Sequence, residues 1–127
     1  MTPKQISDLI QAAQSVHGYY KVSPDVDAGS VSAALITDQG NIYTGICIDA
    51  ACSMGFCAEH AAIAEMLKNR ETHILGALAL SKPEQVIPPC GRCRELMKQI
   101  NSENMAAELA VAIDKFIPLY ELLPYPS

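Results

Sequence analysis

The chain has 127 residues, half of them hydrophobic, so it can bury one compact core but is too short for two domains of ordinary size. We therefore expect a single domain spanning residues 1–127. Apolar stretches are short and the N-terminal residues are polar, which predicts neither a membrane span nor a secretory signal peptide. These features favour a cytoplasmic protein without a membrane partner.

The net charge is −5, from nine Lys and Arg against fourteen Asp and Glu, and the basic residues are scattered between Lys4 and Lys115. Binding to a phosphate backbone requires clustered positive charge that displaces counterions. We therefore expect no nucleic-acid polymer among the partners. A free nucleoside is the nucleic-acid-like ligand that this charge pattern favours.

The N-terminal segment has the residues of a helix start. Thr2 fits the N-cap, Pro3 the first helical position and Gln5 the third, where a Gln completes a capping box. The helix is expected to end before Gly18. Apolar residues recur along it at helical spacing: Ile6, Leu9, Ile10 and Ala13.

A hairpin and a second helix come next. Val31–Thr37 and Asn41–Ile46 are β-prone runs separated by a short turn that ends on Gly40, which predicts two antiparallel strands. Cys57–Arg70 is rich in Ala, Glu, Met and Leu and is the predicted second helix.

The remaining elements alternate between strand and helix. Ile74–Leu80 is a continuous apolar run typical of a strand buried on both faces, and Cys90–Ile100 is the third predicted helix. Only two residues separate the last two strands, Leu109–Ile113 and Phe116–Tyr120, so these must be antiparallel. The predicted fold is a three-layer α/β/α domain with a five-stranded mixed sheet.

The five cysteines are an odd number, which argues against a disulfide framework and for metal binding or catalysis. Cys57 begins the second predicted helix, and Cys90 and Cys93 are three residues apart at the start of the third. The exposed N–H groups and positive dipole of a helix N-terminus favour thiolates. We therefore expect these three cysteines to hold one zinc ion.

Glu59 is the candidate catalytic residue. Three protein ligands on tetrahedral zinc leave the fourth position to a water molecule, and zinc lowers the pKa of that water towards about 7. Glu59 follows Cys57 by two residues and is not needed as a ligand. It is placed to take a proton from the water and to deliver it to a substrate.

These residues resemble the motif of zinc deaminases: a Cys or His ligand, a Glu two residues later, then Pro-Cys-x-x-Cys. The motif is carried by Cys57-Ala58-Glu59 and by Pro89-Cys90-Gly91-Arg92-Cys93-Arg94. From about Ile6 to Pro124 the chain is similar to the cytidine deaminase superfamily, and looks closest to the small tetrameric cytidine deaminases and to blasticidin S deaminase. Further matches in place and order are Val31–Leu35, Tyr43–Gly45 and Glu121–Pro124.

The resemblance implies a hydrolase that acts on a cytosine nucleoside, cytidine or deoxycytidine, in pyrimidine salvage. Zinc-activated water attacks C4 of the ring while Glu59 protonates N3 and then the departing amine, so ammonia leaves and a uracil nucleoside remains. A nucleoside antibiotic of the blasticidin S type is the alternative substrate. The resemblance also implies a homotetramer in which Tyr120–Tyr125 reaches a neighbour's pocket.

The candidate substrate-binding residues that the resemblance implies are Cys47, Asp49 and Ala58. Cytidine deaminases commonly hold the ribose with an Asn-x-Glu pair where this chain has Cys47 and Asp49. Asp49 still accepts a hydrogen bond from a hydroxyl group, whereas Cys47 is a weak substitute. The base-stacking Phe of the family falls near Gly29, and the Arg that often follows the catalytic Glu is His60 here.

Other interpretations of these residues stay open. A closed structural zinc site of Cys57, His60, Cys90 and Cys93 would define a non-catalytic interaction domain, and helical spacing does place His60 on the same face as Cys57. Alternatively, Cys90 and Cys93 form a redox pair of the thioredoxin-like type.

Simpler roles are also open for three residues outside the cysteine motif. Cys47 and Cys52 are then small buried or loop residues, and Asp49 bonds only to nearby backbone.

The two arginines inside the motif also have two interpretations. Arg92 and Arg94 are either surface charges or compensate the charge of the thiolates.

Overall fold

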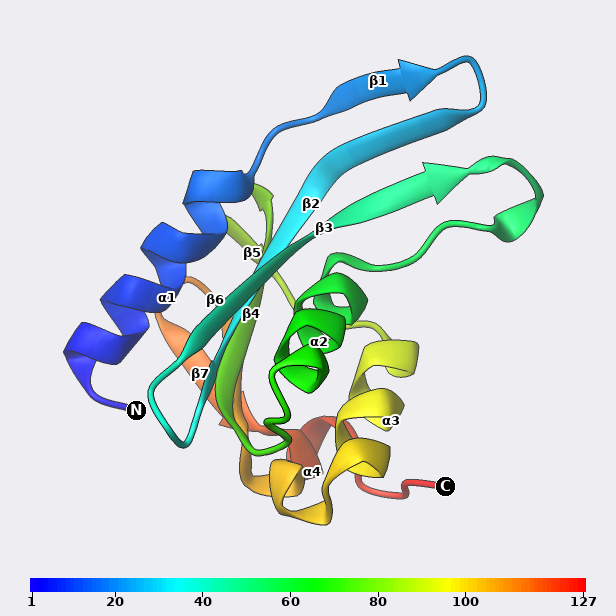
Figure 1. The fold of residues 1–127 in the computed structure, drawn as a ribbon. Coiled ribbons are helices and arrows are strands. Elements are labelled where there is room, and N and C mark those ends of the chain that lie inside the picture. Colours follow the sequence, from blue (N-terminus) through cyan, green and yellow to red (C-terminus); the bar gives the residue numbers. More distant parts are fainter.

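The computed structural model describes residues 1–127 as a twisted sheet with helices on both faces (Figure 1). The helices are α1 (Pro3–Val16), α2 (Ala58–Lys68), α3 (Gly91–Ile100) and α4 (Leu119–Leu122). The strands are β1 (Tyr20–Ser23), β2 (Val26–Thr37), β3 (Ile42–Ala50), β4 (Ile74–Lys82), β5 (Gln85–Ile87), β6 (Glu108–Ala112) and β7 (Lys115–Pro118). None of the helices combines the length and apolar character that a membrane crossing needs.

Five strands form the body of the sheet in the order β3-β2-β4-β6-β7. β4 and β6 run parallel, and the other neighbours in this order are antiparallel. The predicted α/β fold with a five-stranded mixed sheet and an antiparallel closing pair is confirmed for this body. The complete sheet has seven strands, because β1 pairs with the first residues of β2 and β5 with the last residues of β4.

Several boundaries differ from the sequence prediction, and the largest shifts are at the start of β2 and at the end of β3, which reaches Ala50 instead of Ile46. β2 begins at Val26 instead of Val31, so the β2–β3 pair extends to the register Val26–Ala50. At the other end of the chain, the prediction of a strand up to Tyr120 is wrong. The strand stops at Pro118, and the Leu119 side chain is fully buried at the start of α4, where its backbone N–H bonds to the Ala107 carbonyl.

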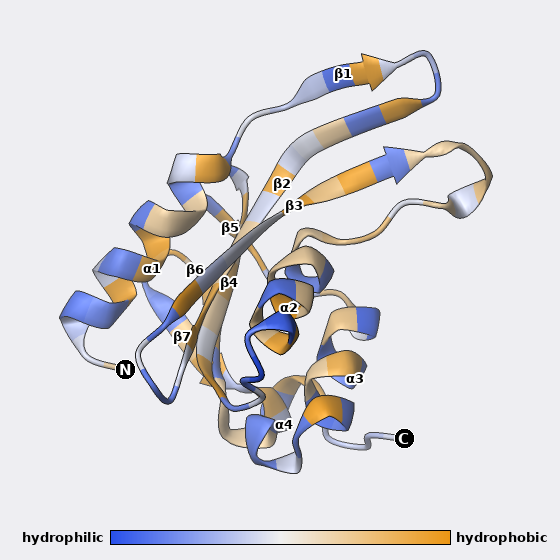
Figure 2. Ribbon diagram, viewed as in Figure 1, coloured by the Kyte–Doolittle hydropathy of each residue, from blue (hydrophilic) through white to orange (hydrophobic).

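The two faces of the sheet carry separate apolar cores. Ala34 and Ile36 of β2 face α1, whereas Leu35, between them, faces α2, as the alternation of side chains along a strand requires. The α1 core also holds Leu9, Ala13, Leu78, Leu80 and Ala110. The larger core on the other face holds residues of α2, α3, α4 and the strands, including Ile63, Met66, Met97, Leu119 and Leu109 of β6. Figure 2 shows hydrophobic residues on helices of both layers.

The predicted helix start at Thr2 is confirmed. The Thr2 hydroxyl oxygen accepts a hydrogen bond from the Gln5 backbone N–H, and the Gln5 side chain accepts one from the Thr2 N–H. Pro3 occupies the first turn, where its missing N–H costs no intrahelical bond.

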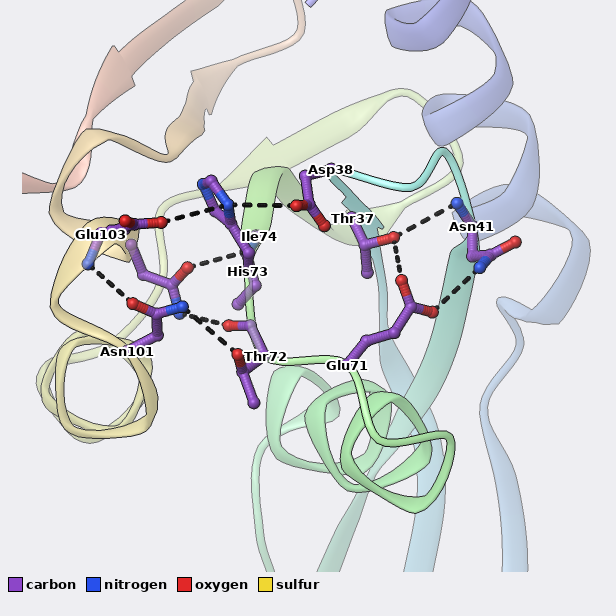
Figure 3. A network of polar contacts seen from close by, with 10 residues as sticks. Thr37, Asp38, Asn41, Glu71, Thr72, His73, Ile74, Asn101 and Glu103 are labelled. Atoms are coloured by element: carbon purple, nitrogen blue, oxygen red, sulfur yellow. Dashed lines mark hydrogen bonds and ion pairs between the residues drawn. The ribbon is translucent and has the colours of Figure 1, made fainter.

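A buried carboxylate joins the β2–β3 hairpin to the segment that follows α2 (Figure 3). Glu71 accepts hydrogen bonds from Thr37 Oγ1 at 2.6 Å, from Asn41 Nδ2 at 3.0 Å and from the Tyr43 hydroxyl group. The Glu71 residue is only 6% exposed. These donors satisfy the charge of a carboxylate that would otherwise be costly to bury.

Candidate active site

The N-termini of two helices bring three cysteines together. Cys57 is the N-cap of α2 and Cys90 the N-cap of α3, and neither side chain caps its own helix. Cys57 Sγ lies 3.3 Å from Cys90 Sγ, which lies 3.5 Å from Cys93 Sγ. All three sulfur atoms are within 4.8 Å of one another.

This cluster has the chemistry and the dimensions of a zinc site. Sulfur ligands at the usual zinc–sulfur distance lie about 3.8 Å apart on a tetrahedral ion. The three cysteines form no disulfide, although their sulfur atoms are in contact. Cys57, Cys90 and Cys93 are therefore the residues that would hold zinc, and three ligands leave one position of the ion for a reactant.

The surroundings shift the pKa values of the three thiols in different directions. Burial raises the pKa of the Cys93 thiol far above its usual range, and the nearby Glu59 carboxylate raises it further. Burial also raises the pKa of Cys57. At Cys90 burial acts in the same direction, but hydrogen bonds from the backbone N–H groups of Cys93 and Arg92 contribute to a net lowering of the pKa. A cation is thus needed to ionise all three thiols together.

Glu59 lies in the first turn of α2, immediately beside the cysteine cluster. The Glu59 residue is only 7% exposed, and burial raises the pKa of its carboxyl group. A carboxyl group with a raised pKa exchanges protons more readily near neutral pH, which suits a general acid and base.

A cavity of about 500 Å³ opens over this cluster. One wall comes from β3 and the segment after it, the other from β5 and the start of α3, and the first turn of α2 contributes Cys57, Ala58 and Glu59. The full lining is Val31, Cys47, Ile48, Asp49, Ala50, Ser53, Gly55, Phe56, Cys57, Ala58, Glu59, Ile87, Pro88, Cys90 and Arg92. The candidate site residues Cys47, Asp49, Cys57, Ala58, Glu59 and Cys90 therefore line one cavity, and the fully buried Cys93 lies behind its wall, in contact with Cys90.

Cys47 and Asp49 differ in what they offer to a ligand. Cys47 is buried and its sulfur accepts a hydrogen bond from the Val31 N–H at 3.3 Å, with Ser30 Oγ also at 3.3 Å. Asp49 is exposed, and its nearest recorded partner is the Cys47 sulfur at 3.9 Å. The Cys47 thiol is thus occupied within the protein, whereas the Asp49 carboxylate faces the cavity with acceptor capacity to spare.

The two arginines of the cysteine motif also differ. Arg94 donates from Nε to the Pro89 carbonyl at 2.8 Å and from Nη1 to the Leu122 carbonyl at 3.0 Å, so it links the start of α3 to the C-terminal segment. Arg92 is exposed and lines the cavity. Arg92 is therefore the arginine placed to compensate negative charge in the site, and Arg94 is structural.

Phe56 was not among the predicted site residues. It precedes Cys57 directly and pairs through its backbone with Ile48 of β3, which brings its ring to the cavity. An aromatic residue next to a metal ligand is a signal that the sequence already contained. Ile87 and Pro88 carry no such signal, because only the fold brings them to the site.

An α/β sheet domain with three clustered thiols and a buried carboxyl group beside a cavity has the parts of a zinc-dependent hydrolase. The family model described as the cytidine and deoxycytidylate deaminase zinc-binding region matches residues 3–108. The chain therefore belongs to the cytidine and deoxycytidylate deaminase family, and zinc is its cofactor.

Solved structures of cytidine deaminases share the fold. The enzyme from Mycobacterium leprae superposes with a TM-score of 0.76 at 20% identity, covering 94% of this chain and 97% of the other. The enzyme from Burkholderia pseudomallei gives 0.73 at 22% identity with complete coverage of both chains. The enzyme from Bacillus anthracis gives 0.67 at 26% identity, covering 96% of this chain and 86% of the other.

Proposed function

We propose that the protein deaminates a cytosine nucleoside, cytidine or deoxycytidine, to the uracil nucleoside with release of ammonia. The observation that carries this proposal is the position of Glu59, a buried carboxyl group with a raised pKa that lines the same cavity as Cys57 and Cys90 of the three-cysteine cluster. A purely structural zinc site has no use for such a group, whereas hydrolytic deamination requires one.

Glu59 moves the protons of the reaction. When bound, zinc supplies a water molecule of lowered pKa as the nucleophile for C4 of the cytosine ring. The Glu59 carboxylate takes a proton from this water and gives it to N3, which makes C4 more electrophilic. The Glu59 carboxylate then takes the remaining proton from the oxygen added at C4 and delivers it to the exocyclic amine. The C4–N bond breaks as the C4 carbonyl forms, so that the amine leaves as ammonia.

The walls of the cavity orient the nucleoside. Asp49 accepts hydrogen bonds from sugar hydroxyl groups, and the buried Ala58, between Cys57 and Glu59, contacts the base. Cys47 contributes shape more than hydrogen bonding, because its sulfur is already bonded to the Val31 N–H. Phe56 supplies an aromatic surface on the cavity against which the base stacks. This chain has no aromatic residue at Gly29, near which the base-stacking Phe of the family falls.

The experiment is the ultraviolet absorbance change when zinc-loaded protein meets cytidine, deoxycytidine and blasticidin S separately. Blasticidin S belongs in this panel because Cys47 replaces a polar ribose-binding residue, which favours a sugar with different polar groups. Turnover of one substrate that is abolished in Glu59→Gln supports the proposal and identifies the substrate. Zinc-loaded protein that converts none of the three would favour the non-catalytic interaction domain.

We also propose that one deaminase domain spans residues 1–127 and assembles as a homotetramer. Tyr19, Tyr20 and Val22 expose more than half of their surface around β1, and Tyr125 is 93% exposed. Burial of these side chains against other copies would stabilise an assembly. A monomeric mass in sedimentation equilibrium would contradict the tetramer.

We propose a cytoplasmic location as well, because free thiols at all five cysteines stay reduced there.

A further inference from the structure

We propose that His60 is a positioning residue of the zinc site: it donates a hydrogen bond from Nδ1–H to the Cys93 thiolate and is not a zinc ligand. The imidazole Nδ1 lies 3.3 Å from Cys93 Sγ. His60 is half-buried in the first turn of α2, three residues after Cys57. The inference rests on the zinc site and goes beyond the proposed deamination.

The direction of this hydrogen bond follows from the chemistry of a metal ligand. A cysteine that binds zinc is a thiolate, which has no proton and only accepts. The recorded hydrogen bonds of Cys93 Sγ join it to Cys90 Sγ and to His60 Nδ1. Since Cys90 is also ionised when it binds zinc, His60 is the donor that remains, and its neutral ring must carry the proton on Nδ1.

Burial makes such a donor valuable at Cys93. The Cys93 residue is fully buried, whereas Cys90 is exposed and Cys57 is half-buried. A buried thiolate costs more free energy than one in contact with water unless it receives hydrogen bonds. Partners that orient and stabilise a metal ligand in this way commonly change metal affinity by about 10- to 100-fold.

The geometry argues against His60 as a fourth ligand. A nitrogen bound to tetrahedral zinc would lie about 3.5 Å from every one of the three sulfur ligands. The group of candidate ligand atoms that all lie within 4.8 Å of one another consists of Cys57, Cys90 and Cys93, without His60. The imidazole thus contacts the cluster from the side of Cys93, and the fourth position of the ion stays available to water.

Two substitutions at His60 test the hydrogen-bond donor separately from the volume of the imidazole ring. His60→Asn keeps an N–H donor close to the place of Nδ1, and His60→Leu removes the donor while it retains apolar volume. Zinc affinity is measured by competition with a chromogenic chelator. We expect the zinc dissociation constant to rise by roughly 10- to 100-fold in His60→Leu and by much less in His60→Asn. His17→Leu is the control, because the His17 ring contacts Ser32 and not the cysteine cluster.

Zinc K-edge X-ray absorption of the wild-type protein provides a readout that does not depend on any variant folding. We expect three sulfur neighbours and one light-atom neighbour without the outer-shell scattering of an imidazole. Imidazole scattering would make His60 a ligand and overturn the proposal, and so would unchanged zinc affinity in His60→Leu. Neither measurement involves substrate, so loss of the proposed deaminase function would leave the result intact.

Discussion

Gly45 of β3 and Ala58 of α2 approach so closely that a β-carbon added at Gly45 would lie 2.5 Å from the Ala58 carbonyl oxygen. The same atom would lie 2.5 Å from the Ala62 backbone nitrogen. Because these neighbours are helix backbone, α2 itself must move to admit a side chain. The missing side chain of Gly45 therefore fixes how near the first turn of α2, with Cys57 and Glu59, lies to the cavity wall.

Gly45→Ala should therefore weaken both folding and zinc binding. Overpacking of this kind typically costs about 1–3 kcal/mol of unfolding free energy. Urea unfolding and chelator competition measure the two effects. Gly40→Ala is the control, since Gly40 has a positive φ of 82° but open space around it, so the substitution strains the turn and leaves the zinc site alone. Normal zinc affinity in Gly45→Ala would show that α2 is positioned by other contacts.

Substitution of a zinc-binding cysteine should remove the metal. Cys93→Ser is expected to yield protein with much less than one zinc per chain and a lower melting temperature, because metal binding stabilises the folded state. Cys52→Ser is the matched control, as Cys52 is exposed and outside the cluster. Metal analysis by mass spectrometry and thermal unfolding provide the readouts. Full zinc occupancy in Cys93→Ser would contradict the three-thiol site.

Asp49 and Cys47 should differ in their effect on substrate binding. Asp49→Ala is expected to lower kcat/KM by roughly 10- to 100-fold, since a hydrogen bond to a charged group contributes about 1.5–3 kcal/mol. Cys47→Ala should change kcat/KM less and reduce stability instead, because the Val31 N–H loses its acceptor. The measurement is the steady-state kcat/KM of each variant on the nucleoside that the wild-type protein converts. A larger kinetic loss in Cys47→Ala than in Asp49→Ala would refute this assignment.

Glu71 should make stability depend on pH in the acid range. Hydrogen bonds from Thr37, then Tyr43 and Asn41, hold the pKa of Glu71 below its ordinary value of 4.5. Figure 3 shows those from Thr37 and Asn41. A depressed pKa means that the stabilisation is present above this value and is lost as the pH falls through the lower pKa of the folded state. The Tyr43 hydroxyl stays protonated throughout, since its pKa is raised to about 12, mainly by the hydrogen bond to Glu71.

The measurement is the free energy of unfolding against pH for the wild-type protein and for Glu71→Gln, which cannot ionise. We expect the difference between the two to be constant near neutral pH and to shrink as the solution becomes acid. Asp114→Asn serves as the control, because Asp114 lies in the turn between β6 and β7 and forms no recorded ion pair. A difference that does not change with pH would rule out an ionised Glu71 in the folded protein.

The elements that the sequence predicted share strong local signals. The capping box at Thr2, the apolar run of β4 and the two helices that begin after Cys57 and Cys90 are each encoded within a few residues. β1 lacks such a signal, since Tyr20–Ser23 is largely exposed and shows no alternation of buried and exposed residues. β5 has three residues in a proline-rich segment, and only pairing with β4 makes it a strand.

The site residues show the same contrast between local sequence signals and contacts that only the fold creates. The three zinc ligands and Glu59 are predicted because their spacing places them at helix starts. The structure clusters the three thiols and places Cys57, Cys90 and Glu59 on one cavity. The opposite wall, with Ile87 and Pro88, depends on how β5 lies beside β4, which no local pattern encodes. The contact between His60 and Cys93 likewise joins two helices and required the structure.

The most direct test of the account is to incubate zinc-loaded protein with cytidine in water enriched in oxygen-18 and to analyse the products by mass spectrometry. Hydrolytic deamination predicts that ammonia and uridine form in equal amounts, and that uridine carries one oxygen-18 atom at C4. Glu59→Gln with full zinc occupancy should form neither product at a comparable rate. Uridine without the solvent label, or equal activity in Glu59→Gln, would contradict zinc-dependent hydrolysis assisted by Glu59.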